Sequence, residues 1–152
     1  MPDLARPASP LVTPPALVTD PVADPGDAAR HFAAQLTFEL DGDTKRATGR
    51  FVLGPRYAGG AGFAHGGVIA ILLDEAMGKI SKLTGERAVT AELNIEYRKP
   101  VPVDAEITVA GWQEEEKGRN RFRIAEIYDA ENVLLARGRG RFVVVAQPIA
   151  VQ

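Results

Sequence analysis

The sequence contains no cysteine and only two histidines, His31 and His65, among its 152 residues. Without cysteine the chain has no disulfide, no thiolate nucleophile and no cysteine-based zinc site. Two histidines are too few for a histidine metal cluster. The composition therefore predicts a protein that does not depend on a metal ion.

The chain also lacks an excess of positive charge and a long apolar run. Its formal net charge is −2, which leaves no basic surplus to neutralise nucleic-acid phosphates. No stretch of about 18 apolar residues is available to span a bilayer, and the N-terminus lacks the pattern of a secretion signal. We expect a cytoplasmic protein that binds neither nucleic acid nor membrane, and a small anionic ligand stays compatible with this charge.

Proline is concentrated at one end, since seven of the eleven prolines fall within the first 25 residues. This composition resists regular strand pairing, and it predicts an arm over residues 1–30 that is flexible or lies across a neighbouring subunit. We expect a single domain over residues 31–147 and a short tail over 148–152. His31 is at the domain edge, where a lone histidine is usually structural.

Hydrophobic periodicity predicts an α+β domain in which one long helix packs on an antiparallel sheet of about six strands. The expected helix runs from residue 67 to 83, with Gly85 just beyond its end. Alternating patterns and turn residues place the strands at 35–40, 44–53, 88–98, 105–115, 120–128 and 133–145. In the strand at 88–98, simple alternation puts Tyr97 on the apolar side and Thr90 on the polar side.

The faces of this helix separate two adjacent acids, Asp74 and Glu75. Core spacing groups the apolar residues Ile69, Leu72, Leu73, Ala76, Ile80 and Leu83 on the sheet side. Glu75 shares a solvated stripe with Lys79 and Lys82, whereas Asp74 lies among the small residues Gly67, Ala70, Gly78 and Ser81. Burial of an ionised carboxylate is unfavourable by several kcal/mol unless it is compensated. Asp74 is therefore either a catalytic acid or base or a buried residue that fixes helix packing.

The start of the helix carries a second candidate group, His65-Gly66-Gly67. The first N–H groups of a helix have no internal partner and lie at its positive end, so they suit a developing oxyanion. The alternative for the glycines is a tight turn from loop to helix. For His65 we expect capping or orientation of the loop through a ring nitrogen rather than the role of a base.

These two groups are too far apart to form one site on one helix. Asp74 lies eight residues after Gly66, which corresponds to about 12 Å along the axis. A catalytic acid must approach within about 3 to 4 Å of the carbon whose oxygen the N–H groups hold. The spacing therefore predicts a site shared between two subunits.

Taken together, these motifs resemble the hotdog-fold acyl-CoA thioesterases, in particular the PaaI-like branch of the 4-hydroxybenzoyl-CoA thioesterase superfamily. The resemblance rests on Ala64-His65-Gly66-Gly67, on an aspartate nine positions after the histidine within Leu73-Asp74-Glu75-Ala76-Met77-Gly78, and on Asn94-Ile95-Glu96-Tyr97-Arg98-Lys99-Pro100. It implies a helix wrapped by an antiparallel sheet, homodimers with active sites at their interface, and commonly homotetramers. Coenzyme A would be present only as part of the substrate.

The resemblance also implies roles for individual residues. Asp74 matches the catalytic carboxylate, as general base or nucleophile, and Gly66 matches the residue whose N–H polarises the thioester carbonyl. His65 matches the histidine that organises the loop, and Thr90 matches a hydroxyl that positions the attacking water. Many relatives carry Asn or Gln six residues before the histidine, where this chain has Gly59, so that side-chain contact with the thioester is missing.

Substrate contacts are expected around the acyl group and the CoA phosphates. We assign Phe63, Ile71 and Met77 to the acyl end, and the basic residues Arg98 and Lys99 to the nucleotide. Gly67, at the helix start, is the remaining expected substrate-binding residue. The alternating Arg137, Arg139 and Arg141 either meet the phosphates or mark a solvent face. The expected function is hydrolysis of an acyl-CoA; the alternatives are a hotdog hydratase or dehydratase and a non-catalytic acyl-CoA-binding protein.

Overall fold

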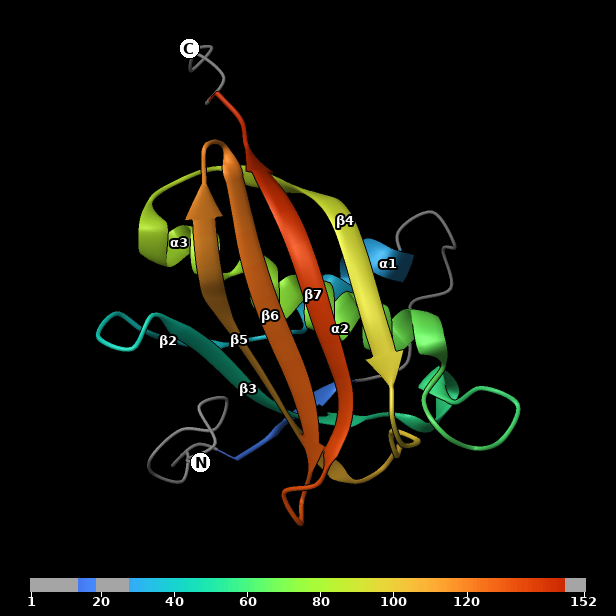
Figure 1. Ribbon diagram of the computed structural model, residues 1–152. Coiled ribbons are helices and arrows are strands. Elements are labelled where there is room, and N and C mark those ends of the chain that lie inside the picture. Colours follow the sequence, from blue (N-terminus) through green and yellow to red (C-terminus); the bar gives the residue numbers. More distant parts are fainter. Residues whose placement is uncertain (1–13, 19–27, 147–152) are drawn as a thin grey trace.

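The computed structural model describes residues 14–18 and 28–146 (Figure 1). Its elements follow one another along the chain as β1 (Ala16–Val18), α1 (Ala28–Ala34), β2 (Glu39–Asp41), β3 (Arg46–Leu53), the 3-10 helix η1 (Pro55–Tyr57), α2 (Gly66–Gly78), α3 (Ile80–Thr84), β4 (Ala88–Tyr97), β5 (Glu106–Lys117), β6 (Asn120–Asp129) and β7 (Leu134–Val144). This order confirms the predicted α+β class.

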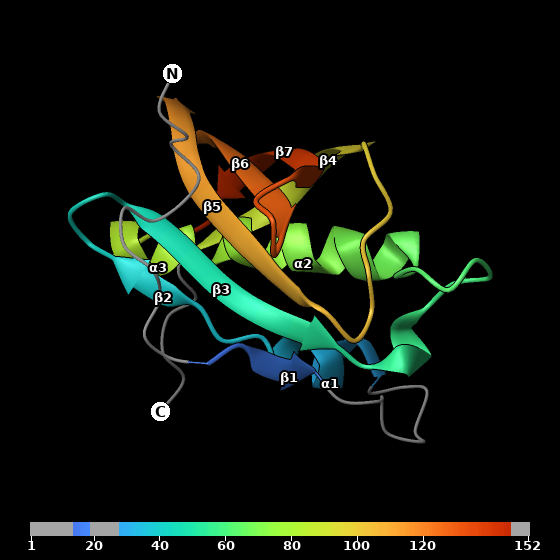
Figure 2. The ribbon, with the colours of Figure 1, turned by 90° about the horizontal axis from the view of Figure 1, so that it is seen from below.

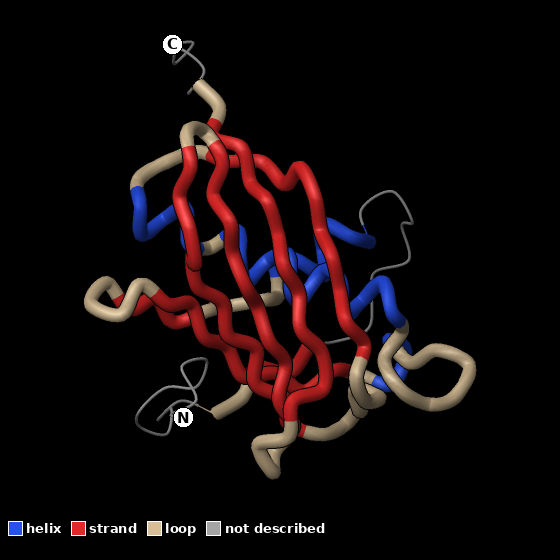
Figure 3. Tube along the Cα trace, viewed as in Figure 1, coloured by secondary structure: helices blue, strands red, loops and turns tan. Residues whose placement is uncertain are grey.

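The strands form one seven-stranded sheet in the order β1-β3-β5-β6-β7-β4, with β2 paired to β3 beside β1. All neighbours are antiparallel except β1 and β3. Figure 3 shows the long strands side by side across the molecule, and Figure 2 shows the sheet curving around α2. The two sides of the sheet end differently: β1 and β2 cover the free edge of β3, whereas within the described residues β4 pairs only with β7.

The N-terminal prediction is wrong for part of the residues it covered. Ala16–Val18 forms β1 in register with Phe51, Val52 and Leu53, and the Val18 side chain is fully buried. A short apolar segment after Pro14-Pro15 is enough to pair with an edge strand, because the prolines precede the strand rather than interrupt it. The domain thus begins before residue 31, and it has one strand more than expected. The rest of the predicted arm and the tail at 148–152 lie largely outside the described residues.

Helix α2 packs on the sheet through the face predicted from its periodicity. Ile69, Leu72, Leu73, Ala76 and Ile80, the last in α3, are buried, whereas Leu83 is only half-buried. The close approach depends on glycine in the facing strands: a Cβ on Gly111 would lie 2.9 Å from the Ala76 backbone. Because burial of apolar side chains is the main stabilising term, this contact fixes the helix that carries the candidate site.

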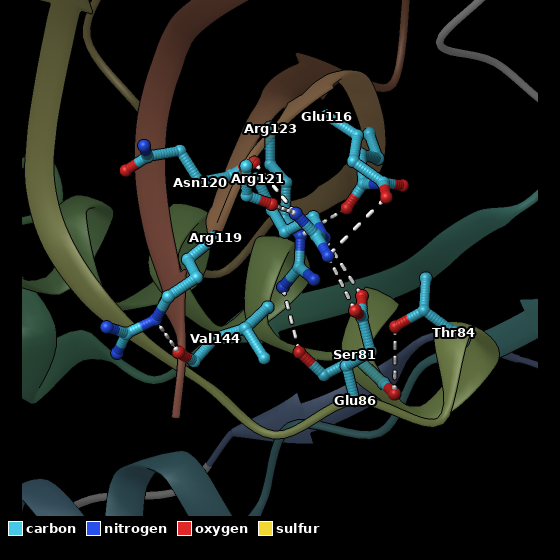
Figure 4. Close-up of polar contacts among 11 residues, drawn as sticks. Ser81, Thr84, Glu86, Glu116, Arg119, Asn120, Arg121, Arg123 and Val144 are labelled. Atoms are coloured by element: carbon cyan, nitrogen blue, oxygen red, sulfur yellow. Dashed lines mark hydrogen bonds and ion pairs between the residues drawn. The ribbon is translucent and has the colours of Figure 1, made fainter. Parts of the chain in front are cut away.

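The single helix predicted over 67–83 is divided at Lys79 into α2 and α3. Opposite this point the fully buried Arg123 of β6 donates from Nη1 to the Met77 carbonyl at 3.0 Å. The same atom donates to Ser81 Oγ at 3.0 Å (Figure 4). In an uninterrupted helix the Met77 carbonyl would accept the Ser81 N–H; here it accepts the guanidinium and the Lys79 N–H. Burial lowers the pKa of Arg123 to about 10, which leaves it charged at neutral pH. The helix ends at Gly85, whose φ of 73° is left-handed as the sequence predicts.

From residue 88 onward the observed strands agree closely with the predicted ones. The poorest agreement is at residues 35–40. There the expected strand is reduced to Glu39–Asp41, because α1 continues to Ala34. In the Asp41–Thr44 turn the Asp41 carboxylate accepts the N–H groups of Asp43 and Thr44, and these bonds lower its pKa. No helix in the described part of the chain is long and apolar enough to cross a membrane.

Candidate active site

His65 starts α2 as its N-cap. Its backbone is extended, with φ −63° and ψ 142°, and its Nδ1 accepts the Gly67 N–H at 3.0 Å. Because Nδ1 accepts, the neutral ring carries its proton on Nε2. His65 therefore caps α2 through a ring nitrogen, which is the geometry expected for it from the sequence.

The two glycines after His65 differ in what their N–H groups do. The Gly67 N–H is bonded to the histidine ring, whereas the Gly66 N–H has no hydrogen-bond partner within the described residues. The His65 carbonyl accepts from Val68 and Ile69 at 3.0 and 3.2 Å, which fixes the peptide plane that contains the Gly66 N–H. Of the two candidates, Gly66 therefore offers the oriented and unused donor that an oxyanion needs.

Asp74 is near the middle of α2 and is half-buried. Thr90 Oγ1, from the first half of β4, donates to Asp74 Oδ1 at 2.7 Å, the usual length of a well-formed hydrogen bond from a hydroxyl. The Thr90 side chain is exposed, so this pair lies on the open side of the molecule. Asp74 is thus held by a hydroxyl at the surface rather than enclosed in the core.

A β-bulge explains why alternation placed Thr90 on the wrong side of its strand. Thr90 pairs with Phe142 and Glu92 pairs with Arg141, so Ala91 is an extra residue in β4. The extra residue reverses the alternation, and Thr90 joins Leu93 and the other helix-facing residues that follow. The exposed Val89, predicted to be buried, is displaced in the same way.

Glu75 is close to Asp74 in sequence but differs from it in surroundings. Its carboxylate lies 4.0 Å from the Lys79 ammonium, at the predicted spacing of four residues. The expected solvated face is only partly open to water at Glu75, because 29% of its side chain is exposed. Burial raises the pKa of Glu75, opposed by Lys79. Glu75 is therefore a partly buried member of an ion pair with no hydroxyl held against it.

Tyr97 at the end of β4 contacts the helix start, although the sequence reasoning quoted it only as part of a motif. Its hydroxyl donates to the Gly66 carbonyl at 3.0 Å, although 55% of the residue is exposed. Its position on the apolar side of the strand suggested a core residue. An exposed tyrosine near a helix start has no signature in sequence that would reveal this contact.

The structure places the predicted substrate residues in different environments. Phe63 is exposed and Ile71 is half-buried. Met77 is fully buried against Gly138 and Gly140 of β7, so of the predicted acyl-pocket residues it lies deepest in the core. The helix turns this side chain toward the sheet because the two glycines leave room for it.

The basic residues are largely paired on the sheet surface. Arg98 lies 3.0 Å from Glu96, and Lys99 is exposed. The three alternating arginines of β7 form ion pairs at 3.1 to 3.8 Å in the combinations Arg137–Glu126, Arg139–Glu114 and Arg141–Glu92. Their geometry favours a charged outer face of the sheet over a phosphate site.

The chemistry available here is acid–base and hydrogen-bonding chemistry. Across the described ranges, no three His, Asp or Glu side chains are grouped to hold a metal ion. The site offers a carboxylate held by a hydroxyl and, about 12 Å away along α2, an unused backbone donor. These groups suit addition of water to a polarised carbonyl and release of a leaving group.

Comparisons with known proteins agree with this arrangement. Residues 61–136 match the family model described as Thioesterase superfamily. Acyl-coenzyme A thioesterase THEM4 from Bos taurus is 31% identical over 119 residues, which cover 75% of this chain and 49% of that protein. The chain thus spans about half the length of this curated relative.

Solved structures share the fold. A hypothetical thioesterase protein with coenzyme A from Streptococcus pneumoniae superposes with a TM-score of 0.67 at 21% identity, covering 74% of this chain and 90% of that one. The E. coli PaaI protein of the phenylacetic acid degradation operon also gives 0.67, at 18% identity, covering 77% and 88%. The long helix wrapped by an antiparallel sheet is the hotdog fold of these thioesterases, and the chain belongs to the thioesterase superfamily.

Proposed function

We propose that this protein is an acyl-CoA thioesterase, which hydrolyses the thioester of an acyl-CoA to a carboxylic acid and free CoA without a resident cofactor. The observation that carries the proposal is the 2.7 Å bond from Thr90 to Asp74, which presents an oriented carboxylate at the surface. Supporting it, two further structures of the Streptococcus pneumoniae protein carry alanine in place of an aspartate and a threonine that lie 16 positions apart. Asp74 and Thr90 have the same separation.

In the proposed reaction Asp74 acts as a general base. The Thr90 hydroxyl donates to Asp74, and its oxygen can accept from a water molecule, which would place that water beside the carboxylate. Asp74 takes a proton as the water oxygen attacks the thioester carbon, and the Gly66 N–H binds the oxyanion that forms. The C–S bond then breaks, and the CoA thiolate leaves and is protonated.

The proposed site is shared by two copies of the chain. Within the described residues one side of β4 is unpaired, and an unpaired edge is a template for another strand. Thr90, beside Asp74, is near the start of β4, and Tyr97, beside Gly66, is at its end. Antiparallel pairing of β4 with its copy would bring the start of one strand to the end of the other. Asp74 of one subunit would then face Gly66 of the second, as the 12 Å separation along α2 requires. We propose this homodimer as the active unit, with a tetramer as a further assembly.

The substrate assignment is tested by assaying the purified protein on a panel of aliphatic and aromatic acyl-CoAs, with release of free thiol as the readout. We expect hydrolysis of at least one member, and Asp74→Asn should reduce kcat/KM by at least ~100-fold. Glu75→Gln is the matched control, since it removes the neighbouring charge and should leave turnover nearly unchanged. Equal effects of the two substitutions, or no hydrolysis of any member, would contradict the proposal.

A further inference from the structure

Tyr97 contacts Gly66 in two ways. Its hydroxyl donates to the Gly66 carbonyl at 3.0 Å. A Cβ on Gly66 would also lie 3.6 to 3.7 Å from the Tyr97 hydroxyl and ring, so the ring rests directly against this glycine. Tyr97 is nevertheless 55% exposed. Burial of the ring therefore does not account for its position, and the hydroxyl bond to Gly66 is the specific contact.

This contact completes the restraint of the glycine pair. The peptide unit that joins Gly66 to Gly67 is held at its N–H by His65 Nδ1 and at its carbonyl by Tyr97. The preceding unit is held at the His65 carbonyl by Val68 and Ile69. Glycine has more conformational freedom to lose than any other residue, and two in succession at a helix start are prone to fray. With both flanking planes fixed, the Gly66 N–H keeps one direction.

We propose that Tyr97 is a positioning residue of the oxyanion hole, which acts through its hydroxyl to keep the Gly66 N–H aimed at the substrate carbonyl. The inference rests on the proposed thioesterase function. It also gives β4 a second role, because the strand that supplies Thr90 to Asp74 supplies Tyr97 to Gly66. Both halves of the proposed site are thus held by the strand at the open edge of the sheet.

The test is Tyr97→Phe, which keeps the ring and removes only the hydroxyl. We expect kcat to fall about 3- to 10-fold, the size of one hydrogen bond, with KM and the urea midpoint of unfolding nearly unchanged. Tyr128→Phe is the matched control: it removes a buried hydroxyl that donates to Glu126 at 3.2 Å. Tyr128 is in β6, which β7 separates from β4, and its loss should leave kcat unchanged.

A double mutant separates positioning from a general structural effect. In a Gly66→Pro protein there is no N–H left to aim, so addition of Tyr97→Phe should change kcat by less than about twofold. An equal loss in both backgrounds would overturn the proposal. A rise in KM with unchanged kcat would do so too, since it would make Tyr97 a substrate contact.

Amide hydrogen exchange measured by NMR tests the contact without reference to activity. In Tyr97→Phe the Gly67 amide should exchange faster than in the wild-type protein, while amides of β5 and β6 keep their rates. Unchanged exchange at Gly67 would overturn the proposal even if thioesterase activity is confirmed. Faster exchange in a protein that hydrolyses no acyl-CoA would instead refute the proposed function, while it would still show that Tyr97 restrains the Gly66–Gly67 peptide.

Discussion

Proline at position 66 removes one hydrogen-bond donor at a place where the fold tolerates it. Gly66 is the first residue of α2, and proline is favoured at this position because its missing N–H would have no helical partner. The residue before a proline must be extended, and His65 already is, with φ −63° and ψ 142°. We therefore expect Gly66→Pro to fold and to lose activity.

The magnitude follows from the loss of a single oxyanion donor. Removal of one such group lowers kcat by about 10² to 10³, or roughly 2.7 to 4 kcal/mol of transition-state stabilisation. Gly66→Ala is the matched control, because it keeps the N–H and places a Cβ at an ordinary contact distance of 3.6 Å from Tyr97. Alanine should therefore retain kcat within a few fold.

The assay is thiol release from the best acyl-CoA, measured for both variants together with circular dichroism and the thermal midpoint. A folded Gly66→Pro protein with wild-type kcat would refute the assignment of the oxyanion donor to Gly66. So would a Gly66→Ala protein as inactive as the proline variant, because the loss would then follow the side chain rather than the N–H.

Three further predictions concern the contacts of Thr90, Glu86 and Glu75. Thr90→Val keeps the shape of the side chain and removes the hydroxyl bonded to Asp74, so it should lower kcat about tenfold or more. Thr90→Ser keeps a hydroxyl and should retain most of the wild-type kcat. Equal rates for the two variants would contradict the role of the hydroxyl. Arg121 holds the pKa of Glu86 below its usual range through bonds of 2.7 and 3.0 Å (Figure 4). This stabilisation is present above the ordinary glutamate pKa and is lost as pH falls through the lowered one, so Glu86→Gln should lower the thermal midpoint at pH 7 and converge with wild type in acid. Burial raises the pKa of Glu75, so its contribution to stability is lost as pH rises through the raised pKa. Glu75→Gln should therefore be at least as stable as wild type at pH 7. A clear loss of stability in this variant would show that the ion pair with Lys79 outweighs the effect of burial.

The sequence predicts those parts of the fold that depend on local periodicity. The apolar face of α2 and the four long strands after residue 88 follow from regular spacing and from turn residues. The divided helix does not, because the contact at the break joins Arg123 to the Met77 carbonyl, which is 46 positions away in sequence. Likewise, β1 forms by pairing with a distant edge, and no composition rule distinguishes it from the prolines around it.

The same distinction separates the site residues. Asp74, His65 and Gly66 could be selected as candidates from the sequence because a carboxylate within an apolar helix and a histidine with two glycines at its start are unusual in themselves. The position of Thr90 depended on a single extra residue, Ala91, and a bulge has no local signature in an alternating strand. Tyr97 was missed as a separate site residue because its contact joins the end of one strand to the start of a helix 31 positions earlier.

Mixing two inactive variants tests the central claim, that one active site is built from Asp74 of one subunit and Gly66 of the other. Asp74→Asn and Gly66→Pro homo-oligomers are combined under conditions that allow subunits to exchange, and thiol release is followed over time. A mixed dimer would contain one intact site and one with both lesions, so free exchange should restore activity at about a quarter of all sites. Absence of recovery, with exchange confirmed by mass spectrometry, would contradict the claim and place each site within a single chain.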